Sequence, residues 1–463
     1  MLNLKGTVSY NQDMQIKKFH LLVIFLVVLC LCMVAAVVPG LRERLAARLD
    51  GMEQRVRAVL YPPQRQIFIP QEAVDEIVAA TLTAAVLSPT PIAPTATLTM
   101  TQTPEPDKPT ATPTPRPTAT ITPTPLPKEV NLKGVRYMDQ HAAWNYCAPA
   151  NLGMALSFYG WKGTREDIGN VVKPYPEDKN VMPYELANYV EEHTKLKVIL
   201  RPGATQALLK SLVAGGFPVL VERGAYIEET TTKLTTWMGH YQVITGYNEE
   251  KQIFITQDSY FRPDYPVPYK EMESGMRAFN YVFLVVYPPE KEKQLFNLLG
   301  AYVDEAEAYR IAFRTAANET VSQTGLDQFF AWYNRGTNLV YMQDYAGAAK
   351  SFDEALAKLY PALPLESNRL PFRMTWYQTG PYFAYYYTGR YRDVVNLVTE
   401  TLTMGAKRTG KPLYLEESFY WRARALSALG DNAAAREDIK ACLKYHPGFN
   451  PCLDEANRLG VKP

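Results

Sequence analysis

Residues 138–161, MDQHAAWNYCAPANLGMALSFYGW, decide how the middle of this chain folds. Their apolar periodicity predicts a helix from Pro149 to about Tyr159, because proline is favoured in the first turn of a helix. Cys147 then lies at or just before the N-cap. A thiol there faces unpaired backbone N–H groups and the positive end of the helix dipole, which both favour the reactive thiolate. A small buried core residue is the alternative interpretation, since cysteine is among the most often buried residue types.

One histidine stands where a strongly patterned core strand begins. His240 follows Gly239 within TWMGHYQVITGY, residues 236–247, whereas the remaining histidines lie beside an apolar run, in polar surroundings or near the C-terminus: His20, His141, His193 and His446. After a polar turn, QIFITQD ends in Asp258. A hairpin loop of three or five residues would place His240 directly opposite Asp258, with Cβ atoms about 5 Å apart. The carboxylate would then hold the imidazole tautomer and stabilise the imidazolium.

Further candidates flank these three residues. Gln140, seven residues before Cys147, has an amide that could join the Cys147 backbone N–H in an oxyanion hole, or it is an ordinary surface-loop glutamine. The neighbouring aromatic residues are predicted to form walls of a substrate cleft, with plain aromatic packing as the alternative: Trp144, Tyr146 and Trp237.

The order of these motifs resembles the papain-like cysteine peptidase family that includes the bacteriocin-processing (double-glycine leader) peptidase domains of peptide exporters. The similarity covers about residues 134–288 and includes GGFPVLVE, residues 215–222, which looks like the family's Gly-x-Pro-Val-x-Val strand. The resemblance implies a list of roles: Cys147 as nucleophile, His240 as general base, Asp258 as third member and Gln140 as oxyanion donor.

This sequence departs from the family pattern at several points. Ala148 stands where the family usually has glycine, which is compatible only with a negative φ at that position. The spacing from Gln140 to Cys147 varies within the family. The sequence also carries no exporter-type transmembrane bundle and no nucleotide-binding motif, so the exporter's leader cleavage does not transfer to it automatically.

The segment around these motifs, residues 129–290, is predicted to be an α+β domain. Helical patterns come first and strand patterns later, which is typical of helices packed on an antiparallel sheet. The expected helices are 149–159, 183–192 and 204–216, with polar turns after the first of them. The expected strands are 197–202, 217–223, 240–247, 252–258 and 280–288.

Residues 291–463 are predicted to be all-α and to resemble tetratricopeptide repeats. Residues 332–356 and 420–447 match the repeat pattern well, and 382–402 match it poorly. In the first unit, small and bulky residues alternate where paired helices touch: Trp332, Gly336, Tyr345, Ala348, Phe352 and Ala355. The repeats are expected to bind an extended peptide or a partner protein in a concave face, or to support the enzyme by packing.

The N-terminal part is predicted to consist of a cytoplasmic segment (1–20), a transmembrane anchor (21–38), an amphipathic juxtamembrane helix with spacer (40–87) and a Pro/Thr-rich linker (88–127). The apolar run is longer than a signal-peptide core, its rival interpretation. The linker has 12 prolines and 13 threonines among 40 residues and should be extended. Arginines after the anchor would place the C-terminal side in the cytoplasm, but they alternate with acids. Because the linker resembles a cell-surface stalk, we expect the extracytoplasmic side.

Composition excludes several function classes. The net charge of +2 gives no reason to expect nucleic-acid binding, and the five cysteines form no CxxC pair or zinc-type cluster, so no metal or cofactor is expected. Cys442 and Cys452 are two core positions or one disulfide, and burial tendencies together with the repeat pattern favour the core. Three functions remain: a membrane-anchored peptidase or amidase acting on a peptide or protein, an inactive peptide-binding module, and an acyl-enzyme transferase.

Overall fold

The computed structural model describes residues 125–143, 145–173, 180–228, 233–366, 369–410 and 412–462. The predicted cytoplasmic segment, membrane anchor and juxtamembrane helix, with nearly all of the linker, lie outside the described residues. Within the described ranges, no helix is long and apolar enough to cross a membrane.

A seven-stranded antiparallel sheet forms the centre of the first region, with the strand order β2-β7-β3-β4-β5-β6 and with β1 paired to β4. The strands are β1 (Glu129–Asn131), β2 (Lys197–Arg201), β3 (Val219–Glu228), β4 (Thr235–Asn248), β5 (Ile253–Gln257), β6 (Tyr265–Pro268) and β7 (Phe283–Tyr287). All five strands expected from the sequence are present, and β1 and β6 are additional.

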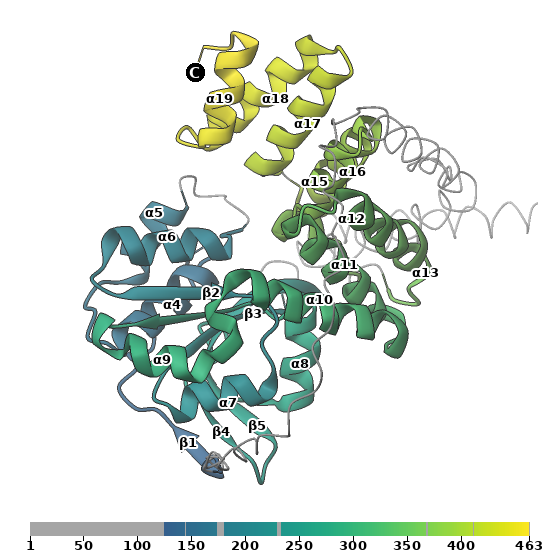
Figure 1. The fold of residues 1–463 in the computed structure, drawn as a ribbon. Coiled ribbons are helices and arrows are strands. Elements are labelled where there is room, and N and C mark those ends of the chain that lie inside the picture. The colour runs from purple at the N-terminus through teal and green to yellow at the C-terminus, as the bar shows by residue number, and fades with distance from the viewer. Residues whose placement is uncertain are drawn as a thin grey trace, which may run out of the picture.

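Helices cover both faces of this sheet (Figure 1). One face carries α4 (Cys147–Ser157), α5 (Arg165–Val172) and α6 (Pro183–His193), and the other carries α7 (Gln206–Ala214), α8 (Tyr269–Arg277) and α9 (Glu292–Leu299). Successive strand residues point to opposite faces, so Leu220 joins the core beneath α4 whereas Val219 and Val221 join the core beneath α7. The α+β prediction for this region is confirmed.

Two local expectations need correction. Polar turns were predicted after Tyr159, but these residues contain α5, whose start is fixed by a capping box between Thr164 and Asp167. The helix α4 begins at Cys147 with Tyr146 as its N-cap, so Pro149 is the third helical residue and not the first. The φ of Ala148 is not positive, so alanine is compatible with this position, where the family usually has glycine.

The second region is helical, as predicted. After the short 3-10 helices η1 (Pro289–Lys291) and η2 (Gly300–Val303), it contains α10 (Glu305–Ser322), α11 (Gly325–Tyr341), α12 (Tyr345–Phe352), the π-helix η3 (Asp353–Leu359), α13 (Tyr360–Ala362), α14 (Met374–Tyr377), α15 (Gly380–Tyr387), α16 (Tyr391–Thr409), α17 (Glu416–Ala428), α18 (Asn432–Tyr445) and α19 (Asn450–Leu459). The expected small-to-large contact is present, because a Cβ on Gly336 would lie 2.7 Å from the Phe352 ring.

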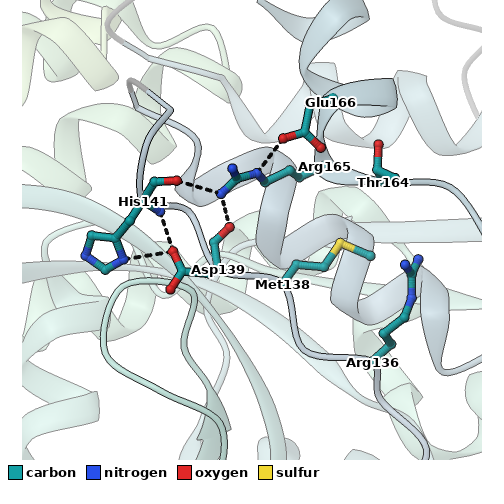
Figure 2. Close-up of a pocket in the computed structure, with 7 residues that line it drawn as sticks. All are labelled: Arg136, Met138, Asp139, His141, Thr164, Arg165 and Glu166. Carbon is teal, nitrogen blue, oxygen red and sulfur yellow. Dashed lines mark hydrogen bonds and ion pairs between the residues drawn. The ribbon is translucent and has the colours of Figure 1, made fainter.

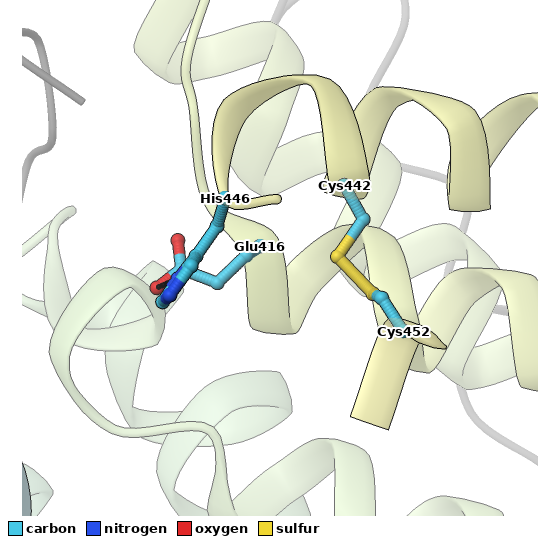
Figure 3. Close-up of a disulfide and its surroundings, with 4 residues drawn as sticks. All are labelled: Glu416, Cys442, His446 and Cys452. Carbon is cyan, nitrogen blue, oxygen red and sulfur yellow. Dashed lines mark ion pairs between the residues drawn. A yellow bond between two sulfur atoms is a disulfide. The ribbon is translucent and has the colours of Figure 1, made fainter. Parts of the chain in front are cut away.

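Cys442 and Cys452 form a disulfide that joins α18 to α19 (Figure 3). This corrects the preference for two separate core positions. Both residues are also fully buried. A half-cystine and a core cysteine therefore occupy the same kind of site here, and the sequence pattern cannot distinguish them.

The two regions share a buried polar and aromatic interface. Arg277 at the end of α8 pairs through Nε with Glu319 of α10 at 2.9 Å and through Nη1 with Asp327 of α11 at 3.1 Å. The amides of Asn280 and Asn338 bond each other at 2.8 and 3.0 Å. These contacts hold the helical region against the edge of the sheet domain.

Candidate active site

Cys147 is the first residue of α4, and its side chain lies half-buried beside β4. His240 and the backbone N–H groups of Tyr241 and Ala148 are placed to form hydrogen bonds with the sulfur. Burial raises the pKa of the Cys147 thiol, but these bonds and the charge of His240 outweigh it and lower the pKa below its ordinary value. The sulfur therefore tends toward the thiolate.

His240 and Asp258 form a buried pair next to this sulfur. Nε2 of His240 lies 3.0 Å from Oδ1 of Asp258, and the two side chains are 1% and 0% exposed. Since Nε2 faces Asp258, Nδ1 is the ring nitrogen left to face the sulfur. Burial lowers the pKa of His240, but the charge and hydrogen bond of Asp258, with those of Cys147, raise it to about 10. Burial likewise opposes the ionised Asp258, whose pKa His240 nevertheless lowers to about 2.

The register between β4 and β5 differs from the sequence prediction. The strands pair Asn248 with Ile253 across a four-residue loop, and a bulge between Ile244 and Gly246 then shifts the register, so that Val243 pairs with Gln257. If this register continues one residue beyond the pair of Val243 and Gln257, Asp258 lies opposite Gln242 and not opposite His240. His240 is the diagonal neighbour of Asp258 on the same face, within reach of a long side chain.

The bulge is what makes this shared face possible. Without it, the register at the loop would set Asp258 opposite Val243, whose side chain points to the other face from His240. Gly246 lies at the bulge where β1 approaches closely, since a Cβ there would be 2.4 Å from the Val130 carbonyl oxygen. The sequence showed the glycine but not the extra residue, and the predicted loop lengths were therefore wrong.

Several donors hold the Asp258 carboxylate in place. Oδ1 accepts the backbone N–H groups of Tyr260 at 2.8 Å and Phe261 at 3.0 Å, and Oδ2 accepts the Nε2 of Gln242. Gln242 was not among the site residues predicted from the sequence. Its position two residues after His240 on one strand face is a signal that could have identified it.

Gln140 is oriented by a chain of hydrogen bonds through Ser259 and Asn151, neither of which was predicted as a site residue. The Ser259 hydroxyl donates to Oε1 of Gln140 at 2.7 Å, and Nδ2 of Asn151 on α4 donates to the same hydroxyl at 2.7 Å. The backbone N–H of Gln140 bonds the Ser259 carbonyl at 2.9 Å. With Oε1 engaged, the Nε2 end of the amide is the donor that remains for a ligand.

The loop that carries Gln140 is tied to α5 beside a pocket (Figure 2). Nη1 of Arg165 donates to the carbonyls of Asp139 and His141, the latter at 3.0 Å, and the His141 ring lies 2.8 Å from the Asp139 carboxylate. Arg165 thereby fixes the loop that leads into the candidate nucleophile.

The three aromatic residues expected at the cleft have different outcomes. Trp144 lies outside the described residues. The Tyr146 ring lies against Gly169 of α5 and beneath the Lys173 ammonium, 4.9 Å from the ring centroid. Trp237 is a correction: it is only 2% exposed and stacks between Phe279 and Phe330 at the interface of the two regions, so it is a core residue and not a cleft wall.

Chemically, this arrangement joins an activated thiol to an imidazole that can carry a proton. A thiolate of this kind can add to a carbonyl carbon, and an imidazolium beside it can protonate a leaving amine. A buried acid, Glu222, lies opposite Tyr241 in the pairing of β3 with β4, and burial together with the charge of Cys147 raises the pKa of Glu222 well above the usual range. Among the described residues, no group of three or more His, Cys, Asp or Glu side chains is arranged to hold a metal ion.

A match to one family model supports the family resemblance. Residues 132–283 match the model of the Peptidase_C39 like family, so this segment forms a C39-like peptidase domain of the papain-like cysteine peptidase class. No curated protein matches the chain. A crystal structure described as a C39-like peptidase from Bacillus anthracis is 17% identical, with a TM-score of 0.29, and the match covers 35% of this chain and 98% of that one.

Proposed function

We propose that this protein is a cysteine peptidase or amidase that cleaves a peptide or protein through a thioester. The observation that carries the proposal is the contact of the Cys147 thiol with His240, whose other ring nitrogen lies 3.0 Å from Asp258. A structural cysteine would need neither a buried imidazole nor a buried carboxylate, which are expensive to bury without a function.

The residues would act in a fixed order. The Cys147 thiolate adds to the carbonyl carbon, while the developing oxyanion accepts N–H groups from Gln140 and from the start of α4. The His240 imidazolium gives its proton to the leaving amine as the C–N bond breaks, which leaves a thioester on Cys147. His240 then takes a proton from water, the hydroxide attacks the thioester carbonyl, and the acid leaves as the thiolate re-forms.

Incubation of the full-length protein with a peptide library, followed by mass spectrometry, tests this function. We expect new amine and acid termini at discrete bonds, and a covalent acyl adduct on Cys147 when turnover is quenched with acid. The Cys147→Ala variant should give neither. Identical products from both proteins, or no product from a wild-type protein whose Cys147 is shown to be reduced, would contradict the proposal.

We further propose that the catalytic and helical regions lie outside the cytoplasm, tethered by residues 21–38. The Cys442–Cys452 disulfide supports this placement, because disulfides persist in oxidising compartments. Successive helices of the helical region pack against each other in pairs, as in tetratricopeptide repeats: α11 with α12, α15 with α16 and α17 with α18. Protease protection of the catalytic and helical regions in sealed membrane vesicles tests their placement outside the cytoplasm. Degradation of these regions by protease added to the cytoplasmic face alone would contradict it.

A further inference from the structure

The edge of β4 beside the sulfur carries a row of outward-facing backbone groups. The strand pairs with β3 from Thr235 to Ile244, but its pairing with β5 begins only at Val243. In an antiparallel strand, the N–H and C=O groups of every second residue point to the same side. The groups of Trp237, Gly239 and Tyr241 therefore share one side of β4, the side where the Tyr241 N–H faces the Cys147 sulfur.

The helical region covers the other two positions of this row. Nη1 of Arg373 donates to the Trp237 carbonyl at 2.9 Å and to the Thr236 hydroxyl at 3.1 Å. The Tyr377 ring lies over Gly239, because a Cβ there would be 3.1 Å from Cε2 of the ring, and the Gly239 N–H is placed to donate to the Tyr377 hydroxyl. We call residues 373–377 the edge cap.

The edge cap is rigidly held. Arg373, Met374 and Trp376 are 8%, 2% and 4% exposed. The residue that follows, Gln378, donates through Nε2 to the Ala278 carbonyl at 2.7 Å, and its own carbonyl accepts the Tyr333 hydroxyl at 2.6 Å. These bonds join the cap both to the end of α8 and to α11. The edge cap is therefore fixed in place beside β4 by burial and by hydrogen bonds to two other helices.

The position of the cap limits how a substrate can lie. An exposed strand edge beside a nucleophile is a natural template for an extended peptide, which would bond to alternate residues of β4. The sulfur faces the N–H of Tyr241, and the Tyr377 side chain covers Gly239, two residues away on β4. Two residues of extended chain span about 7 Å. A peptide running along this edge therefore meets the Tyr377 side chain about two residues from the thiol.

Building on the proposed function, we propose that the edge cap ends the substrate path, so that this peptidase cuts within about two residues of a chain end or acts on short amides. Tyr377 is the specificity-determining residue in this arrangement. A peptidase without such a cap would accept a long chain on both sides of the scissile bond.

Alkylation of Cys147 in the full-length protein by probes of graded length tests this inference. The first pair is iodoacetamide and the iodoacetyl derivative of tetra-alanine amide, which extends toward a C-terminus. The second pair is the chloromethyl ketones of acetyl-alanine and of acetyl-tetra-alanine, the longer of which extends toward an N-terminus. For the wild type, we expect the long probe of one pair to react at least tenfold more slowly than its short partner. Equal rates within both pairs would overturn the inference without any variant.

Variants then identify the blocking residue. Tyr377→Ala should bring the slow long probe to within about threefold of its short partner, whereas Tyr377→Phe keeps the ring and should keep the difference. Tyr387→Ala, at a 48% exposed tyrosine of α15, is the matched control and should match the wild type. An unchanged length difference in a folded Tyr377→Ala protein would refute the role of Tyr377. Iodoacetamide that reacts with native Cys147 no faster than with the unfolded chain would instead refute the proposed function.

Discussion

The sheet domain and the helical region both bury charged groups, but they use them differently. In the sheet domain, Cys147, His240 and Asp258 meet at the start of α4. In the helical region, Arg390 is 3% exposed and binds Asp353 through two nitrogens, at 2.8 and 3.0 Å, and Asp393 at 2.7 Å. By geometry alone, the arginine cluster is the better-bonded of the two.

The difference lies in which protons can move. A guanidinium stays charged at any physiological pH. Burial opposes the charge of Arg390, but its bonds to Asp353 outweigh this and raise its pKa further. A thiol and an imidazole, in contrast, exchange one proton within the accessible pH range. Buried charge therefore indicates catalysis only where one of the partners can give up its proton.

The largest expected effect is on activity. Cys147→Ser replaces the thiolate with a hydroxyl that His240 cannot ionise to a useful extent, and peptide cleavage should fall by at least about 10⁴-fold. Steady-state cleavage of the best library peptide measures it. Stability should change little, because the side chains are nearly the same size. A Cys147→Ser variant with more than a tenth of wild-type activity would place the chemistry elsewhere.

The next effect is on stability alone. Arg277→Met removes one partner of the buried contacts to Glu319 and Asp327, and we expect the free energy of unfolding to fall by about 3–5 kcal/mol. Urea denaturation measures it. Arg310→Met, which removes an exposed pair with Glu307, is the matched control and should leave the midpoint nearly unchanged. Equal losses of unfolding free energy in the two variants would contradict the expectation that the buried ion pairs matter more than the exposed one.

Loss of the disulfide should have a smaller effect. Cys442→Ser with Cys452→Ser should lower the free energy of unfolding by about 2–3 kcal/mol, because the unfolded chain regains the freedom of a loop closed across a sequence separation of 10. Thermal unfolding of wild type and variant measures it, and cleavage activity should remain. A parallel loss of activity in the folded variant would show that the far end of the helical region acts on the catalytic residues.

The smallest effect concerns a residue that only holds the site. Gln242→Leu leaves Oδ2 of Asp258 without its amide donor, so the pKa of Asp258 should rise and the free energy of unfolding should fall by about 1–3 kcal/mol. We expect cleavage to decline about tenfold at neutral pH and to decline more in acid. Cleavage rates between pH 4 and 8 measure this, and a profile parallel to that of the wild type would contradict the role.

The sequence predicted most of the sheet domain because its strands and helices carry clear periodicity. Cys147, His240 and Asp258 were found from their local setting: a helix start, a strand start and a strand end. Gln242 was missed although it shares a face with His240. The hairpin register was wrong because a bulge leaves no mark in the hydrophobic pattern.

Contacts between the two regions were beyond prediction. Trp237 was assigned to the cleft because it lies close in sequence to His240, but it packs on Phe330, almost a hundred residues later. Nothing local marks Tyr377 as a neighbour of Gly239. Such pairs depend on how the helical region docks, and docking is set by many weak contacts that no short pattern encodes.

The pH dependence of Cys147 alkylation by iodoacetamide tests the central claim most directly. In the wild type, His240 lowers the pKa of Cys147, and the imidazolium persists until the pH nears its own pKa of about 10, so alkylation should already be fast near neutral pH. His240→Ala removes both the bond and the charge and leaves burial, which raises the thiol pKa, so the alkylation midpoint should move to higher pH. Coincident midpoints for the two proteins would contradict the account.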